Sequence, residues 1–523
     1  MRVRTSLPKP SSWPEAGRVF AFAFVCFLAL SSLWALASPL MSAPDEPSHA
    51  IKAAAVVRGE WLGQNSEVQG QALRVKVPEY IAALNSVPSC FAFKADRSAA
   101  CAPSISKLGN NLVSATTTAG NYNPLYYAVV GLPTLVTSGQ KAIYGMRLLT
   151  ALWCALFFAV PVAFAHKLWP RRLPTVVTAL AITPMCFFLA GSVNPNAVEI
   201  ATTIAAFVAA FAMFDASFNR PALAASVFGV SGLILANLRP LSIVWLAIAL
   251  VGAALLQWRR GLLKRPPRAI WVGLALAGAG VVLGLAWQMV SNSFQSLGGS
   301  AVKDTPEQVV SVMLERTFDY ARQYVGVMGW LDASLPTVTY VVWDAVAMGL
   351  LVGCLALWRG RRRIGIVLLS AVILLLPVVF QIPAAPELGY IWQGRYILPL
   401  VVVLLVACGF SFEGLDFQSR PARTLLKLTV FCLGFANFYG FVWVLRRYAT
   451  GIGNGIFWDE FFGSPKWQPP GGLALIALLY CAITVWGSLA CIRYLPRRRL
   501  IDAEDEQLES ERRFRIAAGD DRG

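Results

Sequence analysis

Charged residues are scarce in this sequence. Asp, Glu, Lys and Arg make up 14% of its 523 residues, whereas a soluble globular domain carries about a quarter. Hydrophobic residues make up 57% and the mean hydropathy is +0.58, which excludes an ordinary water-soluble fold because such a fold could not cover that much apolar surface. The apolar residues occur in blocks of about 18 to 24, the length that crosses a hydrocarbon core of roughly 30 Å. The composition therefore predicts an all-α polytopic integral membrane protein.

Histidine is almost missing, and cysteine is scattered. The two histidines are His49 and His166, and no group of Cys and His has the spacing of zinc ligands. Most of the ten cysteines lie singly in apolar blocks, as small core residues do. Cys90 and Cys101 differ, because both lie in a long polar stretch. They are a disulfide candidate if that stretch faces an oxidising compartment, and the sequence leaves their bonding open.

The sequence is basic, with a formal net charge of +17. Nucleic-acid-binding proteins also carry such a charge, but here the basic residues cluster in short loops beside apolar blocks. This is the positive-inside pattern of membrane proteins. We therefore expect membrane lipids as partners, and no nucleic acid.

The first apolar block, residues 19–40, follows Arg2 and Arg4 and contains Ala-Leu-Ala-Ser. These features resemble a secretory signal peptide. The run is long for such a peptide, so we favour an uncleaved first span.

Hydropathy, helix caps and helix breakers divide residues 18–492 into about twelve predicted spans. The predicted spans are 18–40, 143–165, 173–193, 196–216, 222–237, 240–257, 269–290, 338–358, 364–381, 397–411, 425–445 and 471–492. The runs at 222–237 and 397–411 are short, and 124–137 is a candidate re-entrant segment. A count one or two higher or lower fits the same pattern.

The asymmetry of Lys and Arg predicts the orientation of the spans. The loops richest in basic residues, which should be cytoplasmic, are 166–172, 257–268 and 359–363. An even number of spans then places both termini in the cytoplasm, as residues 1–17 and a tail, 493–523, whose composition is typical of a disordered segment. Arg446 and Arg447 fall on the outer side and go against this rule.

Two long segments, 41–142 and 292–337, reach the outer face on this topology. Both contain candidate amphipathic helices, which would lie on the membrane surface. One example runs from Thr305 to Tyr324. Five of its residues lie on related faces: Val309, Val312, Met313, Arg316 and Tyr320.

Two adjacent carboxylates, Asp45 and Glu46, directly follow the first span. Carboxylates at a bilayer boundary are costly unless they are solvated or paired, and they often mark functional sites. The structural alternative is that Asp45 caps a surface helix with Pro47 in its first turn. Capping does not exclude catalysis, so both carboxylates are candidate catalytic residues.

Polar and aromatic side chains gather at other points of the outer boundary. The candidate binding residues are Tyr122, Asn123, Tyr126, Tyr127, Asn194, Arg239, Gln393, Arg395 and Tyr396. Aromatic belts, helix capping by Asn194 and contact of Arg395 with ordinary lipid headgroups are the structural alternatives. Because guanidinium binds phosphate bidentately, their coincidence with the carboxylates suggests a site for a lipid phosphate. Arg239 needs an anionic partner, for which a lipid phosphate, Asp45 or Glu46 would serve.

Four motifs in order resemble the DUF2142 family of bacterial membrane proteins, over most of residues 18–490. They are Pro-Asp-Glu-Pro-Ser-His at 44–49, Asn-Pro-Leu-Tyr-Tyr at 123–127, Ser-Val-Asn-Pro-Asn at 192–196 and Gln-Gly-Arg-Tyr at 393–396. The family in turn resembles the GT-C glycosyltransferases, which use polyprenyl-phosphate sugars and have an acidic motif in the first outer loop. Many relatives have Asp where this chain has Asn196, so no catalytic or metal role is carried over to that position.

The resemblance implies a GT-C-like enzyme of the bacterial cytoplasmic membrane, which transfers a sugar from a polyprenyl-phosphate donor to an envelope glycan or lipid acceptor on the outer face. Asp45 would be the general base for the acceptor hydroxyl. Arg395, together with Arg239, would stabilise the departing phosphate. Tyr122, Tyr126 and Tyr127 would stack against the sugar or the prenyl chain.

Two further roles stay open. Glu46 would orient the acceptor or hold a divalent cation, but the sequence offers too few certain oxygen ligands to define a metal site. His49 lies about one helical turn after Asp45, so it either faces the same cleft or is a polar residue of a surface helix.

A transporter or flippase of lipid-linked saccharides is the main alternative, because about twelve spans with interfacial charges also suit alternating access. The span interiors are interpreted as nearly uncharged, with Asp344 as the main exception, and this favours chemistry at the surface. A noncatalytic partner in envelope assembly is the third hypothesis. The sequence does not specify the sugar, the acceptor, the stereochemical outcome or the oligomeric state.

Overall fold

The computed structural model describes residues 13–64, 72–105, 108–169, 172–215, 218–257, 267–292, 301–414, 419–452 and 458–494. Most of the predicted tail at 493–523, most of the basic loop 257–268 and the first twelve residues lie outside these ranges. The described chain is an all-α membrane domain with two small antiparallel sheets of two strands each.

All twelve predicted spans are helical. The corresponding helices are α1 (Trp13–Ala37), α6 (Gly139–Leu168), α7 (Leu173–Leu180) with α8 (Pro184–Ala190), α9 (Pro195–Met213), α10 (Pro221–Ala236), α11 (Ser242–Gln257), α12 (Arg268–Ser291), α15 (Thr337–Leu357), α16 (Arg361–Leu388), α17 (Gly394–Phe410), α18 (Arg420–Thr450) and α20 (Leu473–Tyr494). The end of α16 differs most from its prediction, because the helix continues through Pro383 and Pro386. Prolines are strong helix breakers in water. Inside a membrane bundle they are tolerated, because neighbouring helices can hydrogen-bond the backbone groups that a proline leaves free.

Not all of these helices can cross a membrane alone. Among the described residues, nine helices are long and apolar enough, and α7 with α8 makes a tenth span if the pair is counted as one. This pair is bent by 56° at a short break before Pro184. The remaining two, α10 and α11, have 16 residues each. The prediction of about twelve spans therefore corresponds to nine full-length helices, one broken pair and two short helices.

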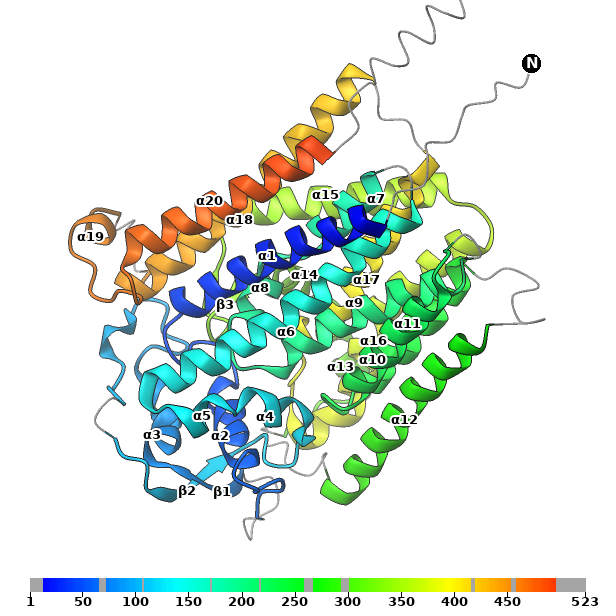
Figure 1. Cartoon of the computed structure of the whole chain (residues 1–523). Helices are drawn as coiled ribbons and strands as arrows, with labels where there is room; N and C mark the ends of the chain where they lie inside the picture. Colours follow the sequence, from blue (N-terminus) through cyan, green and yellow to red (C-terminus); the bar gives the residue numbers. More distant parts are fainter. Residues whose placement is uncertain are drawn as a thin grey trace, which may run out of the picture.

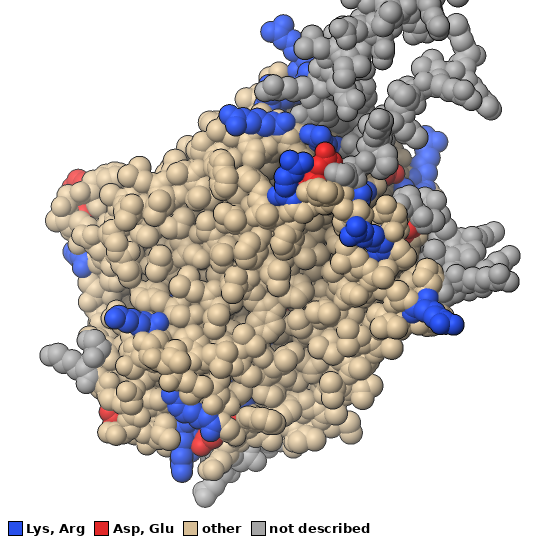
Figure 2. All heavy atoms as spheres, in the orientation of Figure 1, with Lys and Arg blue, Asp and Glu red and all other residues tan. Residues whose placement is uncertain are grey.

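Helix α9 forms the centre of the bundle. All of its residues are buried, and it contacts α6, α10, α11 and α17. Its sequence is rich in Ala, and small side chains allow helices in a membrane to approach one another closely. Peripheral helices instead expose large apolar residues, such as Trp271 and Val282 on α12 and Leu478 on α20. Figure 1 shows the helices side by side, and Figure 2 shows the broad uncharged belt on their surface.

The segment 41–142 forms a cap at one end of the bundle (Figure 1). Its elements are α2 (Glu46–Val56), β1 (Leu73–Pro78), α3 (Glu79–Ala82), a 3-10 helix at Ala83–Cys90, β2 (Leu112–Thr117), α4 (Pro124–Val130) and α5 (Pro133–Val136). Strands β1 and β2 pair in antiparallel register, which the sequence analysis did not predict. The candidate re-entrant segment 124–137 consists of the two short helices α4 and α5. A disulfide joins Cys90 to Cys101.

The second long segment contains the predicted amphipathic helix in two parts. Helix α13 (Pro306–Glu315) and helix α14 (Thr317–Val325) are divided at Arg316. Val309, Met313 and Tyr320 are buried, whereas Val312 is half-buried and Arg316, at the break, is exposed. The predicted face is therefore confirmed only in part. Two short strands, β3 (Val327–Met328) and β4 (Ala333–Ser334), follow, and α19 (Trp458–Gly463) lies beside α18.

Basic residues collect at the end of the bundle where α1 begins, opposite the cap (Figure 2). We call this the basic end, and the end with the cap the site end. Among the described residues, the basic ones adjoining helix termini here include Arg18, Lys167, Arg172, Arg220, Arg268, Arg361, Arg420 and Arg493. Their clustering follows from the alternating direction of the helices, as the distribution of Lys and Arg in the sequence predicts.

Close packing of α8 on α1 gives a first prediction. A Cβ added at Gly191 would lie 2.7 Å from the backbone nitrogen of Ala35 and 2.9 Å from the carbonyl oxygen of Ser31. We expect Gly191→Ala to lower the free energy of unfolding by about 1–3 kcal/mol, as overpacking does, measured by thermal unfolding in detergent. Gly278→Ala on α12 is the matched control, because a Cβ there meets nothing within 4 Å. Equal unfolding midpoints for both variants would contradict this packing.

Candidate functional site

Glu46 and Arg147 form a fully buried ion pair at the site end. Nε of Arg147 donates to Oε1 of Glu46 at 2.7 Å, and Nη2 donates to Oε2 at 2.8 Å. The remaining donors of the guanidinium bind the carbonyl oxygens of Ala35, Ser38 and Pro39. Glu46 also accepts from the backbone N–H groups of Ala43 and Val193. Both side chains are 0% exposed, so every polar atom of the pair has its partners inside the protein.

The ion pair with Arg147 gives Glu46 a structural role, which distinguishes it from the neighbouring carboxylate of Asp45. It joins the end of α1, the start of α2, helix α6 and the turn before α9. Because Glu46 is buried and fully hydrogen-bonded, it has no free face for an acceptor or a cation. We therefore leave Glu46 out of the candidate chemistry, although it was predicted beside Asp45 as a catalytic residue.

Asp45 directly precedes α2, at the N-cap position, but its side chain does not cap the helix. Its backbone is left-handed, with φ of 64°, a conformation that is uncommon outside glycine and that often occurs at functional sites. Its side chain is 46% exposed, and Oδ2 accepts a hydrogen bond from Nη2 of Arg395 at 2.5 Å. The predicted capping role is thus wrong for the side chain, and the carboxylate instead faces Arg395.

The charge of Asp45 is set by opposing effects. Burial raises the pKa of its carboxyl group, but the positive charge of Arg395 lowers it, with a smaller contribution from Arg239. The net pKa lies below its ordinary value, so Asp45 is ionised at neutral pH. An ionised and partly exposed carboxylate can accept a proton from a bound hydroxyl.

Arg395 lies in the first turn of α17, where it is held from two sides. The preceding Gly394 packs on α14, since an added Cβ would lie 2.8 Å from the carbonyl oxygen of Tyr320, and its N–H donates to Gln323 at 2.7 Å. Arg395 is 2% exposed and also donates to the carbonyl oxygen of Pro44 at 3.2 Å. This close packing explains the glycine in Gln-Gly-Arg-Tyr.

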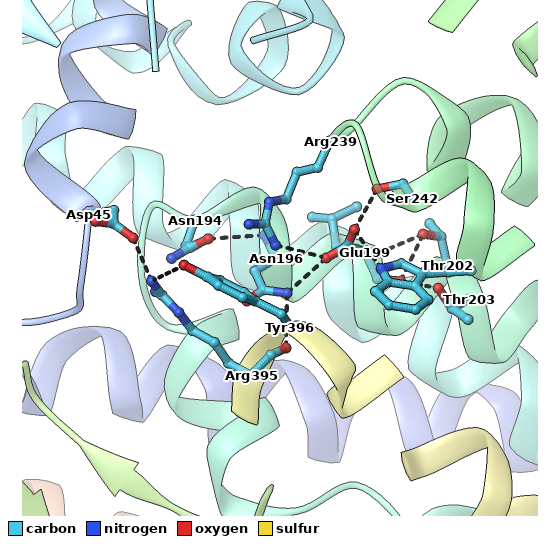
Figure 3. A network of polar contacts seen from close by, with 12 residues as sticks. Asp45, Asn194, Asn196, Glu199, Thr202, Thr203, Arg239, Ser242, Arg395 and Tyr396 are labelled. Atoms are coloured by element: carbon cyan, nitrogen blue, oxygen red, sulfur yellow. Dashed lines mark hydrogen bonds and ion pairs between the residues drawn. The ribbon is translucent and has the colours of Figure 1, made fainter. Parts of the chain in front are cut away.

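Two guanidinium groups contact the ring of Tyr396. Cζ of Arg239 lies 4.7 Å from the ring centroid and Cζ of Arg395 lies 5.2 Å from it. Tyr396 is half-buried, and the hydroxyl of this residue accepts from Arg395 at 3.5 Å. Figure 3 shows Arg239 and Arg395 reaching this ring from different elements. The arrangement concentrates positive charge beside the Asp45 carboxylate.

Glu199 is the anionic partner of Arg239. Its Oε2 accepts from Nη1 of Arg239 at 3.2 Å, and Glu199 is fully buried in α9. Ser242 and Trp245 of α11 donate to Oε1 at 2.5 and 3.0 Å. We expected Asp45, Glu46 or a lipid phosphate to be the anionic partner of Arg239. This expectation is wrong, because Glu199 inside the bundle is that partner.

Asn194 and Asn196 connect the two ends of this network (Figure 3). As predicted, Asn194 caps α9, accepting from the N–H of Asn196 at 3.0 Å, and Pro195 begins the helix. Asn194 also donates to the carbonyl oxygen of Pro44. The side chain of Asn196 donates to Glu199 at 2.9 Å and to the carbonyl oxygen of Arg395 at 3.3 Å.

Three buried polar atoms of the network have no hydrogen-bond partner among the described residues. They are Oδ1 of Asn196, Oε1 of Gln393 and Nε of Arg395. Buried polar atoms usually have a partner, and exceptions call for an explanation such as a bound molecule. One of these atoms, Nε of Arg395, belongs to the guanidinium that binds Asp45, and a donor at this position fits a polar ligand.

The other predicted residues divide between this network and the core. Tyr122 is half-buried. Burial raises the pKa of its hydroxyl group, and the nearby charge of Arg239 opposes this shift. His49 is buried and its Nδ1 lies 2.9 Å from the hydroxyl of Tyr127. Tyr126 and Tyr127 are 0% exposed, and Tyr126 binds Thr150, so neither presents a face to a substrate here. Asn123 caps α4 and donates to Asn237 at 2.8 Å.

The geometry does not provide a preformed metal centre in the part of the chain that the structure describes. There, no group of three or more His, Cys, Asp and Glu side chains could hold a metal ion. Asp45, Glu46 and Glu199 each pair with an arginine. A divalent cation at Glu46 or Glu199, which are fully buried, would have to displace a guanidinium.

Sequence reasoning missed two residues of this region, Arg147 and Glu199. Both lie inside predicted spans, so the interpretation that the span interiors are nearly uncharged, with Asp344 as the main exception, is wrong. The signal was available, because an ionisable residue within a membrane span marks a buried pair or a functional site. Their partners, however, lie 101 and 40 residues away in the sequence, and only the fold brings them together.

A family model described as "Predicted membrane protein (DUF2142)" matches residues 27–404. The matched range includes every residue of the network, from Asp45 to Tyr396. No curated protein matches the chain.

The buried pair gives a second prediction. We expect Glu46→Leu to lower the free energy of unfolding by about 3–5 kcal/mol, because it leaves the Arg147 charge buried without an anion. The double variant Glu46→Leu/Arg147→Leu should recover most of this loss. Thermal unfolding of purified protein in detergent measures both, and a single variant as stable as the wild type would contradict the role of the pair.

His49 gives a third prediction. Burial lowers the pKa of His49 to about 3, whereas the unfolded residue has a pKa near 6.5. Between these values only the unfolded state binds the proton, so stability should fall with acidification below about pH 6.5, by up to about 1.4 kcal/mol per pH unit. We expect His49→Gln to lose less stability than the wild type between pH 7 and 4.5 in thermal unfolding. Parallel curves for the two proteins would show that His49 does not contribute.

Proposed function

The chain belongs to the DUF2142 family of membrane proteins, and we propose that it is a glycosyltransferase of GT-C type. It moves a sugar from a polyprenyl-phosphate donor to a glycan or lipid acceptor of the cell envelope. The observation that carries the proposal is the half-exposed carboxylate of Asp45 beside the guanidinium groups of Arg395 and Arg239. A base next to a phosphate-binding pair is what transfer from a lipid phosphate needs.

In the proposed reaction, the acceptor hydroxyl attacks the anomeric carbon of the donor and transfers its proton to Asp45. The bond between that carbon and the phosphate oxygen breaks, and the phosphate leaves with the bonding electrons. Arg395 and Arg239 stabilise the negative charge that develops on the phosphate. Because this is a single displacement, it inverts the anomeric configuration.

Donor binding also activates the base in this proposal. Without donor, Arg395 holds the pKa of Asp45 below its ordinary value. A phosphate at Arg395 would neutralise part of that charge, weaken the ion pair and raise the pKa of Asp45 toward its usual range. The carboxylate would then be freed and become more basic only when a donor is in place.

The proposed location is the outer side of the bacterial cytoplasmic membrane. The site end then faces outward and the basic end inward, in agreement with the positive-inside rule, with both termini in the cytoplasm. Polyprenyl-phosphate sugars would be the donors and membrane lipids the surroundings.

Transport of lipid-linked saccharides is the second candidate, favoured by the bent pair α7 and α8 and by the buried charge of Glu199 in α9. Broken helices and ionisable groups within spans are common in transporters. Against it, Glu199 is already bonded to Arg239, Ser242 and Trp245 near the start of α9. A noncatalytic partner in envelope assembly is the third candidate.

The fourth prediction tests the transferase directly. Purified protein in lipid is incubated with a panel of radiolabelled polyprenyl-phosphate sugars and envelope glycan acceptors. We expect transfer by the wild type and a loss of at least about a hundredfold in Asp45→Asn, the range for removal of a general base. Arg395→Lys should also lose activity, because an ammonium group cannot bind phosphate as a planar fork does.

Glu60→Gln is the matched control, since this carboxylate lies in the cap and binds the backbone N–H of Lys76, outside the network. It should transfer sugar like the wild type. An active Asp45→Asn variant would rule out Asp45 as the base. The transporter would be favoured by two results together: no donor gives sugar transfer, and the wild type but not the Asp45→Asn variant moves the same lipids across vesicle membranes.

A further inference from the structure

A cavity of about 440 Å³ lies at the side of the bundle, between α1, α7, α18 and α20. Its lining is almost entirely apolar and includes Phe22, Leu30, Leu180 and Gly487. None of the residues of the Asp45 network lines it. We call this cavity the lateral groove.

The lateral groove runs along the helices. On α1 its lining extends from Arg18 to Leu30, and on α20 from Ile483 to Tyr494. At 1.5 Å per residue these stretches are roughly 17 to 18 Å long. A narrow apolar space of this length, parallel to helices that cross the membrane, has the dimensions and direction of a lipid acyl chain.

A small residue, Gly487, keeps part of the groove open. A Cβ added at Gly487 would meet nothing within 4 Å, so this glycine leaves open space on α20. A larger side chain here would enter the groove without displacing the backbone of a neighbouring helix. The space is therefore a property of particular residues that substitution can remove.

The basic end of the groove carries excess positive charge. Arg18 lines the groove itself, and Arg172 stacks on the ring of Tyr494, another lining residue, at 4.8 Å. Close by, Lys167 and Arg220 lie 5.0 and 4.2 Å from the ring of Trp13, at the start of α1. Glu15 is the acidic residue in the first turn of α1. Among the described residues named here, four cations exceed one acid, and this excess attracts an anion to the end of the groove.

We propose that the lateral groove binds one acyl chain of an anionic phospholipid, whose phosphate lies among the cations at the basic end. The apolar walls bind the acyl chain, and the cations bind the anionic headgroup. The combination distinguishes an anionic lipid from a neutral one with identical chains. This inference does not rest on the proposed glycosyltransferase activity.

The fifth prediction concerns retention of lipid by the delipidated, full-length protein. The protein is incubated in detergent with phosphatidylglycerol or with phosphatidylcholine of the same chains, and bound lipid is counted by native mass spectrometry. We expect at least tenfold more phosphatidylglycerol than phosphatidylcholine on the wild type. Equal retention of the two lipids would overturn the proposal.

Two kinds of variant test separately the binding of the lipid acyl chain and the binding of the lipid headgroup. Gly487→Leu should fill the groove and abolish selective retention, whereas Gly349→Leu on α15, where a Cβ also meets nothing within 4 Å, should behave like the wild type. The double variant Arg18→Gln/Arg172→Gln should lose the preference for phosphatidylglycerol, with the groove left open. Wild-type selectivity in both Gly487→Leu and the double variant would overturn the proposal. Stronger retention of undecaprenyl phosphate than of phosphatidylglycerol would also overturn it.

Discussion

A charge inside an apolar bundle is stable only when an opposite charge and hydrogen bonds replace its water, and this constraint organises the site end of the protein. Glu46 with Arg147 is the most complete example, because the pair also binds the backbone at the end of α1 and before α9. It fixes the turn from which α2 begins. Asp45, one residue earlier, is consequently held at the rim of the bundle.

The same constraint produces a gradient of exposure along the network. Glu199 is fully buried and bonded to side chains from three segments, whereas the side chain of Asp45 is half-exposed and bonded to Arg395. A saturated carboxylate positions its neighbours, and a partly exposed one remains available for proton transfer. The buried end therefore holds Arg239 in place, and the exposed end has the freedom that chemistry requires.

The site depends on the whole bundle, because its members come from α2, α9, the turn between α10 and α11, and the start of α17. No single segment contains both an acid and its arginine. Each ion pair thus joins parts of the chain that are far apart in the sequence, and a site of this kind forms only when the helices have packed. The lateral groove differs, since it is formed by missing side-chain volume and has charge at only one end.

Sequence alone was sufficient for the class and most of the architecture. Long apolar runs must be helical in a membrane, because every backbone polar group has to be hydrogen-bonded within its own segment, and all twelve predicted runs are helices. Local capping was also predictable at Asn194 and Pro195, where the side chain bonds a backbone group two residues away. The pairing of β1 with β2 was not predicted, because short strands in a polar segment carry a weak pattern and other elements separate these two in the sequence.

Tertiary structure alone decided which charges meet. Asp45 and Glu46 are adjacent and chemically alike, yet the left-handed backbone at Asp45 sends one toward Arg395 and the other toward Arg147. The sequence identified Arg239 and Arg395 as cations at a boundary but could not assign their partners, and Glu199 was overlooked within its apolar run. Hydropathy and capping depend on near neighbours in the chain and can be recognised in the sequence. Ion pairing depends on distance in space, which the packing of α9 against its neighbours determines.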